Sequence, residues 1–474
     1  MPAKGAHVDV IVGGGIVGLS IAWRLARSGR PVTVVDPAPA SGASHAAAGM
    51  LAPVSEVTYT ETPLLRLGMA SLRRWPSFAA ELAEDAGWAE RTAASDGETP
   101  AADAGGRGAR AGASGGPGAG PSGGVGPSGG LGVGPFGGLE IGEGPRRGLD
   151  LRADGTLDVA FGADDLAALD ELAAYMDKLG LPVERLTGRE CRRLEPMLAP
   201  SVRGGLLAPE DAWVDPRRVT AALLVALDRL QVPLVRARAA GLLRDADGKV
   251  VGVHLEPSRE PSEIRAERVV LAAGAWSAEL ADVPVRPIKG QIMRLRSPQP
   301  LLSRCVRGTV HGSYVYLVPR GDGELVVGAT QEELGFDTRV TAGGLYELLR
   351  DARELVPGVS ELEVADVVAG LRPGTPDNLP IIGPSGTPGL TLATGHYRGG
   401  VLLAPLTAAL VLADSSSSGG SGDSGDVGGS ASLGDTSASA GSAGLGGSAG
   451  FGGLGGDEGE LAALCSPGRF REIS

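Results

Sequence analysis

The sequence GGGIVG at residues 13–18 has the spacing of a turn that binds the phosphates of a nucleotide. In such a turn Gly13 makes the tight bend, Gly15 lets the backbone approach a pyrophosphate, and Gly18 lets helix and strand touch. Asp36 lies eighteen positions after Gly18, where a carboxylate can accept hydrogen bonds from a ribose. This spacing predicts a dinucleotide site rather than a plain strand–helix turn, and it leaves NAD and FAD equally open.

This turn needs two strands and a helix to hold it in place. Residues 8–12 form an apolar, β-branched run that predicts one strand, and residues 32–35 predict a second strand that ends at Asp36. Between them, apolar residues recur every three or four positions over 16–26, so one face of a helix can pack on a sheet. The N-terminus of that helix would offer free N–H groups and a positive dipole to a phosphate.

Two later stretches of small residues could also approach a ligand. Residues 37–53 are mostly Ala, Gly, Ser and Pro, which lets the backbone lie against a planar or anionic group, and Ser44 could hydrogen-bond a phosphate. An ordinary small-residue helix is the alternative for this stretch. Residues 272–277 end a buried strand predicted at 268–271 with a small-residue turn, which predicts a second close approach to the cofactor.

The C-terminal half of the chain repeats the pattern of strand, glycine turn and helix. Residues 390–394 predict the strand, GHYRGG at 395–400 forms the turn, and the apolar run 401–413 predicts the helix. This arrangement offers a second helix N-terminus to a ligand. A nicotinamide site does not require a second helix N-terminus. His396, which lies within the turn, is more typical of a structural hydrogen-bonding residue than of an acid or base.

Polar side chains in the predicted antiparallel strands are the remaining candidates. Tyr314 and Tyr316 lie two positions apart in the strand predicted at 312–319, and therefore on one face of it. Two phenols on one face favour a polar site, with packing at a domain interface as the alternative for Tyr314. Arg372 follows a strand predicted at 364–370 and precedes Pro-Gly, and its type alone is equally compatible with a surface ion pair.

Composition divides the 474 residues into ordered and low-complexity parts. Many of the 77 glycines lie in two tracts, 93–148 and 414–460, that have too few bulky apolar side chains to offset the entropy of ordering. We predict that both tracts are disordered surface insertions rather than partner-binding arms. The net charge of −13 argues against a nucleic-acid-binding surface.

Cysteine usage and the apolar runs indicate a cytoplasmic protein. Cys191, Cys305 and Cys465 are far apart and lack the spacing of a metal site, which fits a reducing compartment and predicts no bound metal. The first residues lead directly into a strand without the pattern of a signal peptide. The run 401–413 is too short to cross a bilayer and contains Pro405, so no membrane association is expected.

Taken together, the motifs resemble the FAD-dependent D-amino-acid-oxidase family, and within it the bacterial glycine oxidases of thiamin biosynthesis. The resemblance covers nearly all of the ordered chain, and its most specific parts are AAAGMLAP and GHYRGGVLLAP. It is carried by VDVIVGGGIVGLSIAWRLA with Asp36, SHAAAGMLAP at 44–53, LAAGAWS at 271–277, PIKGQ at 287–291, YVYLVPR at 314–320, LVVGAT at 325–330, AGLRPGTPDNLPIIG at 369–383 and GHYRGGVLLAP at 395–405.

This resemblance implies a fold of the α/β plus α+β class with two domains. One is a Rossmann-like FAD-binding domain, and the other is a substrate domain built on a mostly antiparallel sheet. The predicted division is FAD-binding domain at 1–92, 215–285 and 364–413, substrate domain at 149–214 and 286–363, disordered insertions at 93–148 and 414–460, and a C-terminal tail at 461–474.

The resemblance also implies roles for single residues. It places Arg372 on the substrate carboxylate with Tyr316 beside it, and it places Arg398 and Met50 near the flavin ring. A guanidinium presents two parallel N–H groups that match a carboxylate, which lysine cannot do. The positions expected to contact the cofactor are Gly13, Gly15, Ile16, Val17, Gly18, Asp36, Ser44, Ala47, Ala48, Gly49, Met50, Ala273, Gly274, His396, Arg398, Gly399, Gly400 and Val401.

The activity that the resemblance implies is oxidative deamination by noncovalent FAD. Glycine and similar small amines, such as sarcosine and small D-amino acids, would yield the imine and H2O2, for thiazole formation in thiamin biosynthesis. A D-amino-acid oxidase or dehydrogenase with another substrate or electron acceptor is the alternative. Expected partners are the small amino acid, O2, the thiazole-forming enzyme and further copies of the chain. Gln331 stands where a glycine oxidase would have a bulky apolar residue, which predicts a more polar pocket.

Overall fold

The structure is a computed structural model that describes residues 8–88, 148–256, 261–310, 312–417 and 457–470. Most of the two tracts predicted to be disordered, residues 93–147 and 418–456, lies outside the described residues. Both ends of the second tract are helical. The helix α9 (Ala404–Ser417) continues past residue 414, and α10 (Glu458–Leu464) begins before residue 460 with Asp457 as its N-cap.

A six-stranded sheet carries the glycine turn of residues 13–18. Its strand order is β18-β19-β12-β1-β2-β8, and all neighbouring pairs are parallel except β18 with β19. Every residue of β1 is buried, as expected for a parallel strand covered on both faces. The strands are β1 (Asp9–Val12), β2 (Val32–Val35), β8 (Leu234–Val235), β12 (Arg268–Leu271), β18 (Ile381–Pro384) and β19 (Leu390–Thr394).

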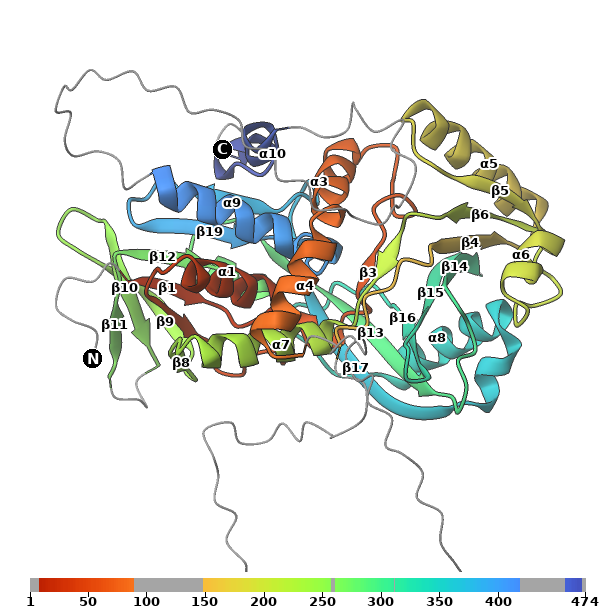
Figure 1. The fold of residues 1–474 in the computed structure, drawn as a ribbon, viewed down its shortest axis with the longest axis horizontal. Helices are drawn as coiled ribbons and strands as arrows, with labels where there is room; N and C mark the ends of the chain where they lie inside the picture. The colour runs from red at the N-terminus through yellow and green to blue at the C-terminus, as the bar shows by residue number, and fades with distance from the viewer. Residues whose placement is uncertain (1–7, 89–147, 257–260, 311, 418–456, 471–474) are drawn as a thin grey trace, which may run out of the picture. The chain divides into compact units, whose positions relative to one another are not determined.

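Helices from distant parts of the chain pack beside this sheet. Helix α1 contacts both α9 and α7, and Figure 1 shows the red α1 and the blue α9 side by side although nearly 400 residues separate them. Buried side chains of these helices form one apolar core with Ile11 and Val34 of the sheet. The helices are α1 (Ile16–Arg27), α3 (Thr62–Leu72), α4 (Trp75–Asp85) and α7 (Pro216–Arg229), with α9 as given above.

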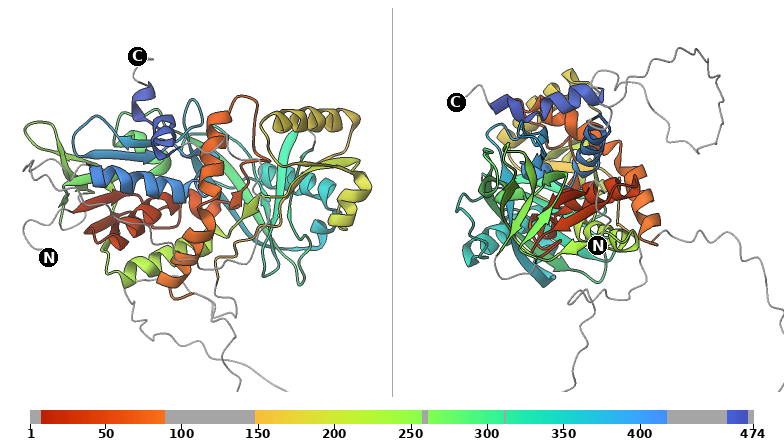
Figure 2. Two further views of the ribbon diagram at one scale, coloured as in Figure 1. Left: turned by 45° about the horizontal axis from the view of Figure 1, so that its top comes forward. Right: turned by 90° about the vertical axis from the view of Figure 1, so that its left-hand side faces the viewer.

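The second large sheet has eight strands in the order β17-β13-β16-β15-β14-β4-β6-β5. All neighbouring pairs are antiparallel except β4 with β14, so the predicted mostly antiparallel sheet is confirmed. Helix α8 (Ala342–Leu355) packs on this sheet (Figures 1 and 2). The strands are β4 (Thr156–Ala160), β5 (Glu184–Thr187), β6 (Gly204–Ala208), β13 (Arg286–Arg296), β14 (Cys305–Val310), β15 (Ser313–Pro319), β16 (Glu324–Gly328) and β17 (Glu363–Gly374).

Smaller elements complete the described chain. A three-stranded sheet and a two-stranded ribbon accompany the two large sheets, together with short helices. They are β9 (Ala239–Arg244), β10 (Val250–Leu255), β11 (Glu263–Arg265), β3 (Met50–Leu51), β7 (Ala212–Trp213), α2 (Ala43–Ala46), α5 (Ala163–Lys178), α6 (Gly188–Leu194), η1 (Gly274–Glu279), η2 (Pro357–Glu361), η3 (Tyr397–Gly399) and η4 (Pro467–Phe470). No helix in the described ranges is long and apolar enough to cross a membrane.

Two strand predictions differ from the structure because prolines and long-range pairing intervene. The sequence GGLLAPEDAWV at 204–214 predicts one strand, but the structure splits it into β6 and β7, which belong to different sheets. Pro209, which has no N–H, lies between them. The runs 149–152 and 156–161, on either side of the turn residues 153–155, predict a hairpin, which does not form. Arg152 bridges to Trp213 instead, and β4 pairs with β6 and β14.

Two helix predictions and one domain boundary also change. Apolar residues at helical spacing over 63–86 predict a single amphipathic helix. The structure breaks it between α3 and α4, where Pro76 cannot donate to the carbonyl group of Leu72. The helix expected from residue 401 begins at Ala404, after the turn η3. Strand β17, assigned above to the FAD-binding domain from residue 364, pairs with β13 along almost its whole length and therefore belongs to the eight-stranded sheet.

Candidate active site

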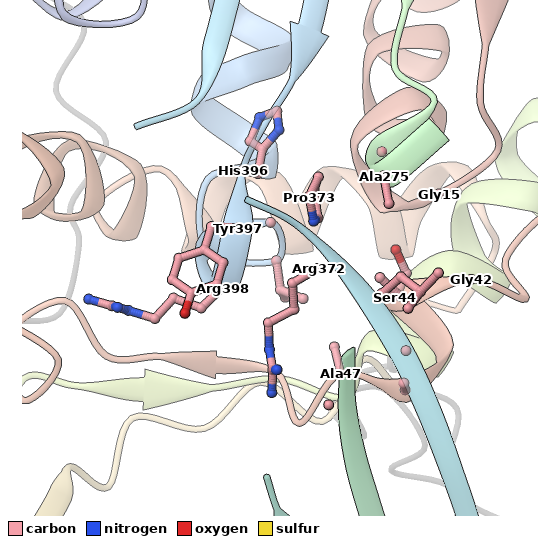
Figure 3. Close-up of a pocket in the computed structure, with 18 of the residues that line it drawn as sticks. Gly15, Gly42, Ser44, Ala47, Ala275, Arg372, Pro373, His396, Tyr397 and Arg398 are labelled. Atoms are coloured by element: carbon pink, nitrogen blue, oxygen red, sulfur yellow. The ribbon is translucent and has the colours of Figure 1, made fainter. Parts of the chain in front are cut away.

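A cavity of about 960 Å³ is lined by residues from both large sheets and from the loops between them. Figure 3 shows Gly15, Gly42 and Ser44 toward one end and Arg398 toward the other, with Arg372 extending from β17 between them. The volume lies at the upper end of the range of ligand pockets, roughly 300–1,000 Å³. A long ligand that joins the glycine turn to Arg372 therefore has room.

The N-terminus of α1 forms the first end of the cavity. Gly15 is the N-cap residue and offers no side chain there, and the N–H of Ile16 donates to Ser44 Oγ at 2.9 Å. Gly13 has φ +119°, and an added Cβ would collide with the backbone carbonyl oxygen of Ala272. The predicted strand, tight turn and helix are thus confirmed, with their N–H groups beside the cavity.

Asp36 lies at the end of β2 and lines the same part of the cavity. Its carboxylate accepts hydrogen bonds from the N–H groups of Gly14 and Ala38, each at 2.7 Å. Burial raises its pKa, while these two N–H donors act in the opposite direction. Each carboxylate oxygen has a second acceptor position, so Asp36 can still accept from the hydroxyl groups of a ribose.

The small-residue loop at 45–48 is fixed from behind by three arginines that the sequence did not single out. Arg217 Nε donates to the carbonyl oxygen of His45 at 3.0 Å, and Arg320 donates to that of Ala48. Arg294 Nη2 lies 3.4 Å from the carbonyl oxygen of Ala47. Charged donors to these carbonyl groups hold the loop against the cavity.

Most of the predicted site residues line this one cavity. Gly18 and Gly399 do not: Gly18 packs on the backbone of Gly13, as expected for a helix–strand contact, and Gly399 faces Leu403. The predicted residues that line it are Gly13, Gly15, Ile16, Val17, Asp36, Ser44, Ala47, Ala48, Gly49, Met50, Ala273, Gly274, Tyr316, Arg372, His396, Arg398, Gly400 and Val401.

Arg372 lies in β17 and is half-buried at the second end of the cavity. Its Nη1 donates to the carbonyl oxygens of Lys289, at 3.3 Å, and Thr330, at 3.2 Å. Within the described residues, no carboxylate pairs with this guanidinium, and its further side-chain hydrogen-bond partner is the Tyr316 phenol. The two carbonyl groups orient the side chain, and the remaining N–H groups are available to a ligand carboxylate.

Tyr316 lies beside Arg372. Burial raises the pKa of its phenol, and the neighbouring Arg372 guanidinium opposes that shift. The phenol is therefore a neutral hydrogen-bond donor at physiological pH. Its ring covers Gly328 so closely that an added Cβ there would collide with the tyrosine ring.

Gly290 has no side chain, and this leaves room for the Arg372 guanidinium. A Cβ on Gly290 would collide with the Arg372 guanidinium, whose flexible end can move away at little cost in stability. We expect Gly290→Ala to displace this guanidinium and to raise the KM for the amino-acid substrate about tenfold or more, since a charge-assisted hydrogen bond is lost. Steady-state kinetics and thermal melting measure the two effects.

The matched control for this substitution is Gly241→Ala. Gly241 is also a strand residue, but the nearest atom to its added Cβ is 4.0 Å away. Unchanged kinetics and melting are expected for Gly241→Ala. An unchanged KM in Gly290→Ala would show that the position of Arg372 does not determine substrate binding.

Arg398 and His396 occupy the turn after β19. Arg398 pairs with Glu61, and its Nε lies 3.9 Å from Glu56 Oε2; burial lowers its pKa, but the two glutamates outweigh burial and raise it. His396 is buried, its Nε2 lies 2.9 Å from Thr407 Oγ1, and burial lowers its pKa to about 4. His396 is therefore neutral at physiological pH and does not serve as an acid there.

Further polar residues line the cavity near Tyr316 without having been predicted. These residues are Arg307, Asp158 and Ser55, and they line the cavity together with Tyr314 and Gln331. Nothing local in the sequence marks the first three, because they come from β14, β4 and a loop. These groups are polar, and the greater polarity predicted from Gln331, relative to a glycine oxidase, stays a prediction.

Asp211 supports this region from outside the cavity. It is fully buried and accepts hydrogen bonds from the N–H groups of Val54, at 3.2 Å, and Ser55, at 3.1 Å. Burial raises its pKa to about 6, although these donors and Arg307 act against the shift. The folded protein therefore holds a proton that the unfolded chain releases between about pH 4 and pH 6.

This raised pKa predicts how stability depends on pH. The contribution of Asp211 is complete below about pH 4 and is lost as the pH rises through about 6. Relative to the wild type, Asp211→Asn should gain on the order of 3 kcal/mol in the free energy of unfolding between pH 4 and pH 7. Urea unfolding of both proteins across this range measures it, and a pH-independent difference would contradict the prediction.

The fold and the cavity together define a class of protein. A Rossmann-like glycine turn and an arginine–tyrosine pair at opposite ends of one cavity are typical of a flavin enzyme that acts on a small carboxylate-bearing substrate. The family described as FAD dependent oxidoreductase, DAO, matches residues 10–115 and 139–414, and the chain belongs to this family.

Individual relatives agree with the family. The chain is 34% identical over 402 residues to the bifunctional protein ThiO/ThiG of Nostoc sp. (strain PCC 7120), covering 85% of this chain and 51% of that protein. It is 31% identical over 419 residues to the glycine oxidase of Geobacillus kaustophilus, covering 85% of this chain and 90% of that protein. The chain thus spans about half the length of the ThiO/ThiG relatives that it matches.

A solved structure of a relative has the same fold. The crystal structure of glycine oxidase from Geobacillus kaustophilus superimposes with a TM-score of 0.67 and 30% sequence identity, and it covers 86% of this chain and 94% of that chain. The predicted family and fold class are therefore confirmed.

FAD is the cofactor of this family, and the residues present fit it. The open N-cap at Gly15 and the acceptor Asp36 suit the pyrophosphate and the ribose. Side chains larger than hydrogen at Gly13, Gly14 and Gly49 would collide with their neighbours, so the backbone itself forms this wall. We expect the residues of this wall to hold the nucleotide part of FAD and those near Arg372 and Tyr316 to face the substrate.

Proposed function

We propose that the protein catalyses the FAD-dependent oxidative deamination of glycine and similar small amines, such as sarcosine and small D-amino acids. The observation that carries the proposal is the Arg372 guanidinium, which has no carboxylate partner in the described chain and lines the same cavity as the glycine turn. A partly buried guanidinium without an acidic partner favours a carboxylate ligand. The relative from Geobacillus kaustophilus is named glycine oxidase.

The chain's own residues would bind and orient the substrate. Arg372 takes the carboxylate through two parallel hydrogen bonds, and the neutral Tyr316 phenol donates a further one. Met50 and Ala48 belong to a partly apolar wall near this end, with Cys305 Sγ 3.7 Å from Met50 Sδ. When bound, FAD accepts the two electrons removed from the amine and passes them to O2.

None of the residues beside Arg372 is assigned as a general acid or base. Oxidation needs the substrate amine to be neutral, and His396 is a buried hydrogen-bond partner of Thr407 on another side of the cavity. The arrangement therefore favours catalysis by positioning over catalysis by proton transfer.

We propose thiamin biosynthesis as the setting, with the thiazole-forming enzyme as a partner and self-association of the chain. The name ThiO/ThiG joins two functions in a relative of this chain, which supports an association with the second of them. Co-purification of the two proteins, with the thiazole-forming enzyme carrying the tag, would test this association.

The function itself is tested with purified holoprotein. We expect release of H2O2 and an imine-derived aldehyde or keto acid with glycine, sarcosine and D-alanine as substrates, with glycine or sarcosine used best. Reduction of the flavin without peroxide would favour the related dehydrogenase with another electron acceptor. Bound flavin that none of the three amines reduces would exclude the proposal.

A further inference from the structure

One row of the eight-stranded sheet carries three polar side chains on the face toward the cavity. Tyr316 of β15 is directly opposite Arg307 of β14, and Arg307 is directly opposite Asp158 of β4. Paired residues of neighbouring strands point to the same face of a sheet, and in the antiparallel pair of β14 and β15 their Cβ atoms are about 4.5–5.5 Å apart. All three line the cavity. Arg307 is thus the immediate neighbour of the tyrosine that stands beside Arg372.

Arg307 is buried but incompletely hydrogen-bonded. It is 7% exposed, its Nε donates to Tyr314 Oη, and its Nη1 donates to Ser55 Oγ at 3.1 Å. A guanidinium has five N–H groups, so three of them have no partner among the described residues. Nη2 is not among the buried atoms that lack a partner, so its N–H groups are accessible from the cavity, where a bound ligand can accept from them.

The neighbouring carboxylate of Asp158 does not accept hydrogen bonds from these remaining N–H groups of Arg307. Asp158 Oδ2 accepts a hydrogen bond from Tyr314 Oη at 2.7 Å, and it lies 3.5 Å from Arg307 Nε. The contact is therefore made on the Nε side of the guanidinium. Burial raises the pKa of Asp158 to about 6, and the Arg307 charge opposes that shift. The outer fork of Arg307, carrying Nη2, stays available.

We infer that Arg307 forms a second anion subsite in the cavity, and that the enzyme accepts small amino acids or N-substituted glycines that carry a second carboxylate. This inference rests on the proposed function and narrows its substrate class. Arg372 would hold the carboxylate next to the oxidised carbon, and Arg307 would hold the other across Tyr316. Tyr314, Thr309 and Gln331 make the surrounding wall polar, which suits a charged substituent better than an alkyl one.

Binding of ligands that cannot be oxidised tests the subsite without turnover. The holoprotein is titrated with dicarboxylates of three to six carbons, from malonate to adipate, and with the monoamide of each. The changes in the flavin absorbance spectrum report binding. For at least one length, we expect the dicarboxylate to bind roughly tenfold or more tightly than its monoamide, because an ionic hydrogen-bond pair replaces a neutral one.

Two substitutions and a control assign the effect to Arg307. Arg307→Met should bring the ratio between the two affinities close to one, whereas Arg339→Met, which removes an arginine that is 86% exposed, should leave the ratio unchanged. Asp158→Asn should increase the preference for the dicarboxylate, because it removes a competing negative charge beside the fork. A merely structural ion pair would not produce that increase.

The outcomes separate this inference from the proposed function. Equal binding of every dicarboxylate and its monoamide to the wild type, or a preference that survives in Arg307→Met, would overturn the subsite. The wild-type titration gives this answer even where a variant fails to fold. Reduction of the flavin by glycine is measured separately, so the proposed function can hold while the subsite fails, or the reverse.

Discussion

Replacing Arg372 with alanine is expected to raise the KM for glycine roughly 100-fold or more while FAD stays bound, because two charge-assisted hydrogen bonds to the carboxylate are lost. Arg372 lines the cavity and has no acidic partner in the part of the chain that the structure describes. Steady-state kinetics, together with the flavin absorbance of the purified variant, measures both parts of this result.

Arg372→Lys is the informative comparison. Lysine keeps the positive charge but loses the planar fork, so an intermediate KM is expected. In the wild type, Arg372 also donates to the carbonyl groups of Lys289 and Thr330, so a purely structural role is the competing explanation. Loss of FAD or of thermal stability in Arg372→Ala, with an unchanged KM, would support that explanation and contradict the proposed role.

Replacing Gly13 with alanine is expected to have the largest effect on the cofactor site. Gly13 has φ +119°, a conformation that costs other residues about 1–3 kcal/mol, and the new Cβ would also collide with the rigid carbonyl oxygen of Ala272. The turn between β1 and α1 would have to move. We therefore expect loss of most bound FAD and a fall in Tm of roughly 5–10 °C.

Gly343→Ala serves as the control for this change. Gly343 lies in the first turn of α8, and its added Cβ meets nothing within 4 Å. Its flavin content and kinetics should equal those of the wild type, with a Tm that is unchanged or slightly higher because alanine favours a helix. If Gly13→Ala keeps its flavin and its Tm, the glycine turn does not form the cofactor wall described above.

Local patterns explain why the cofactor end could be predicted from the sequence. The spacing of Gly13, Gly15 and Gly18 between two β-branched runs determines a strand, turn and helix over fewer than thirty residues, and the structure confirms it. The shared face of Tyr314 and Tyr316 follows in the same way from the two-residue period of a strand. Such features depend on near neighbours only.

The polar end of the cavity depends on pairing between distant strands. Arg307 and Asp158 meet because β4 runs parallel to β14, a pairing across about 150 residues that no local pattern indicates. Arg398 was expected near the flavin, but its pairing with Glu61 of α3's N-cap could not be foreseen from either segment. The single helix predicted at 63–86 is wrong because Pro76 has no N–H to continue the helical hydrogen bonds, so α4 starts anew beside it.

The measurement that tests the central claim most directly is anaerobic mixing of the purified holoprotein with glycine, followed by the visible absorbance of the flavin. We predict that the oxidised flavin bands bleach with glycine, return when O2 is admitted, and do not bleach at the same glycine concentration in Arg372→Ala. Purified protein that binds FAD but keeps its oxidised spectrum with glycine, sarcosine and D-alanine would contradict the account.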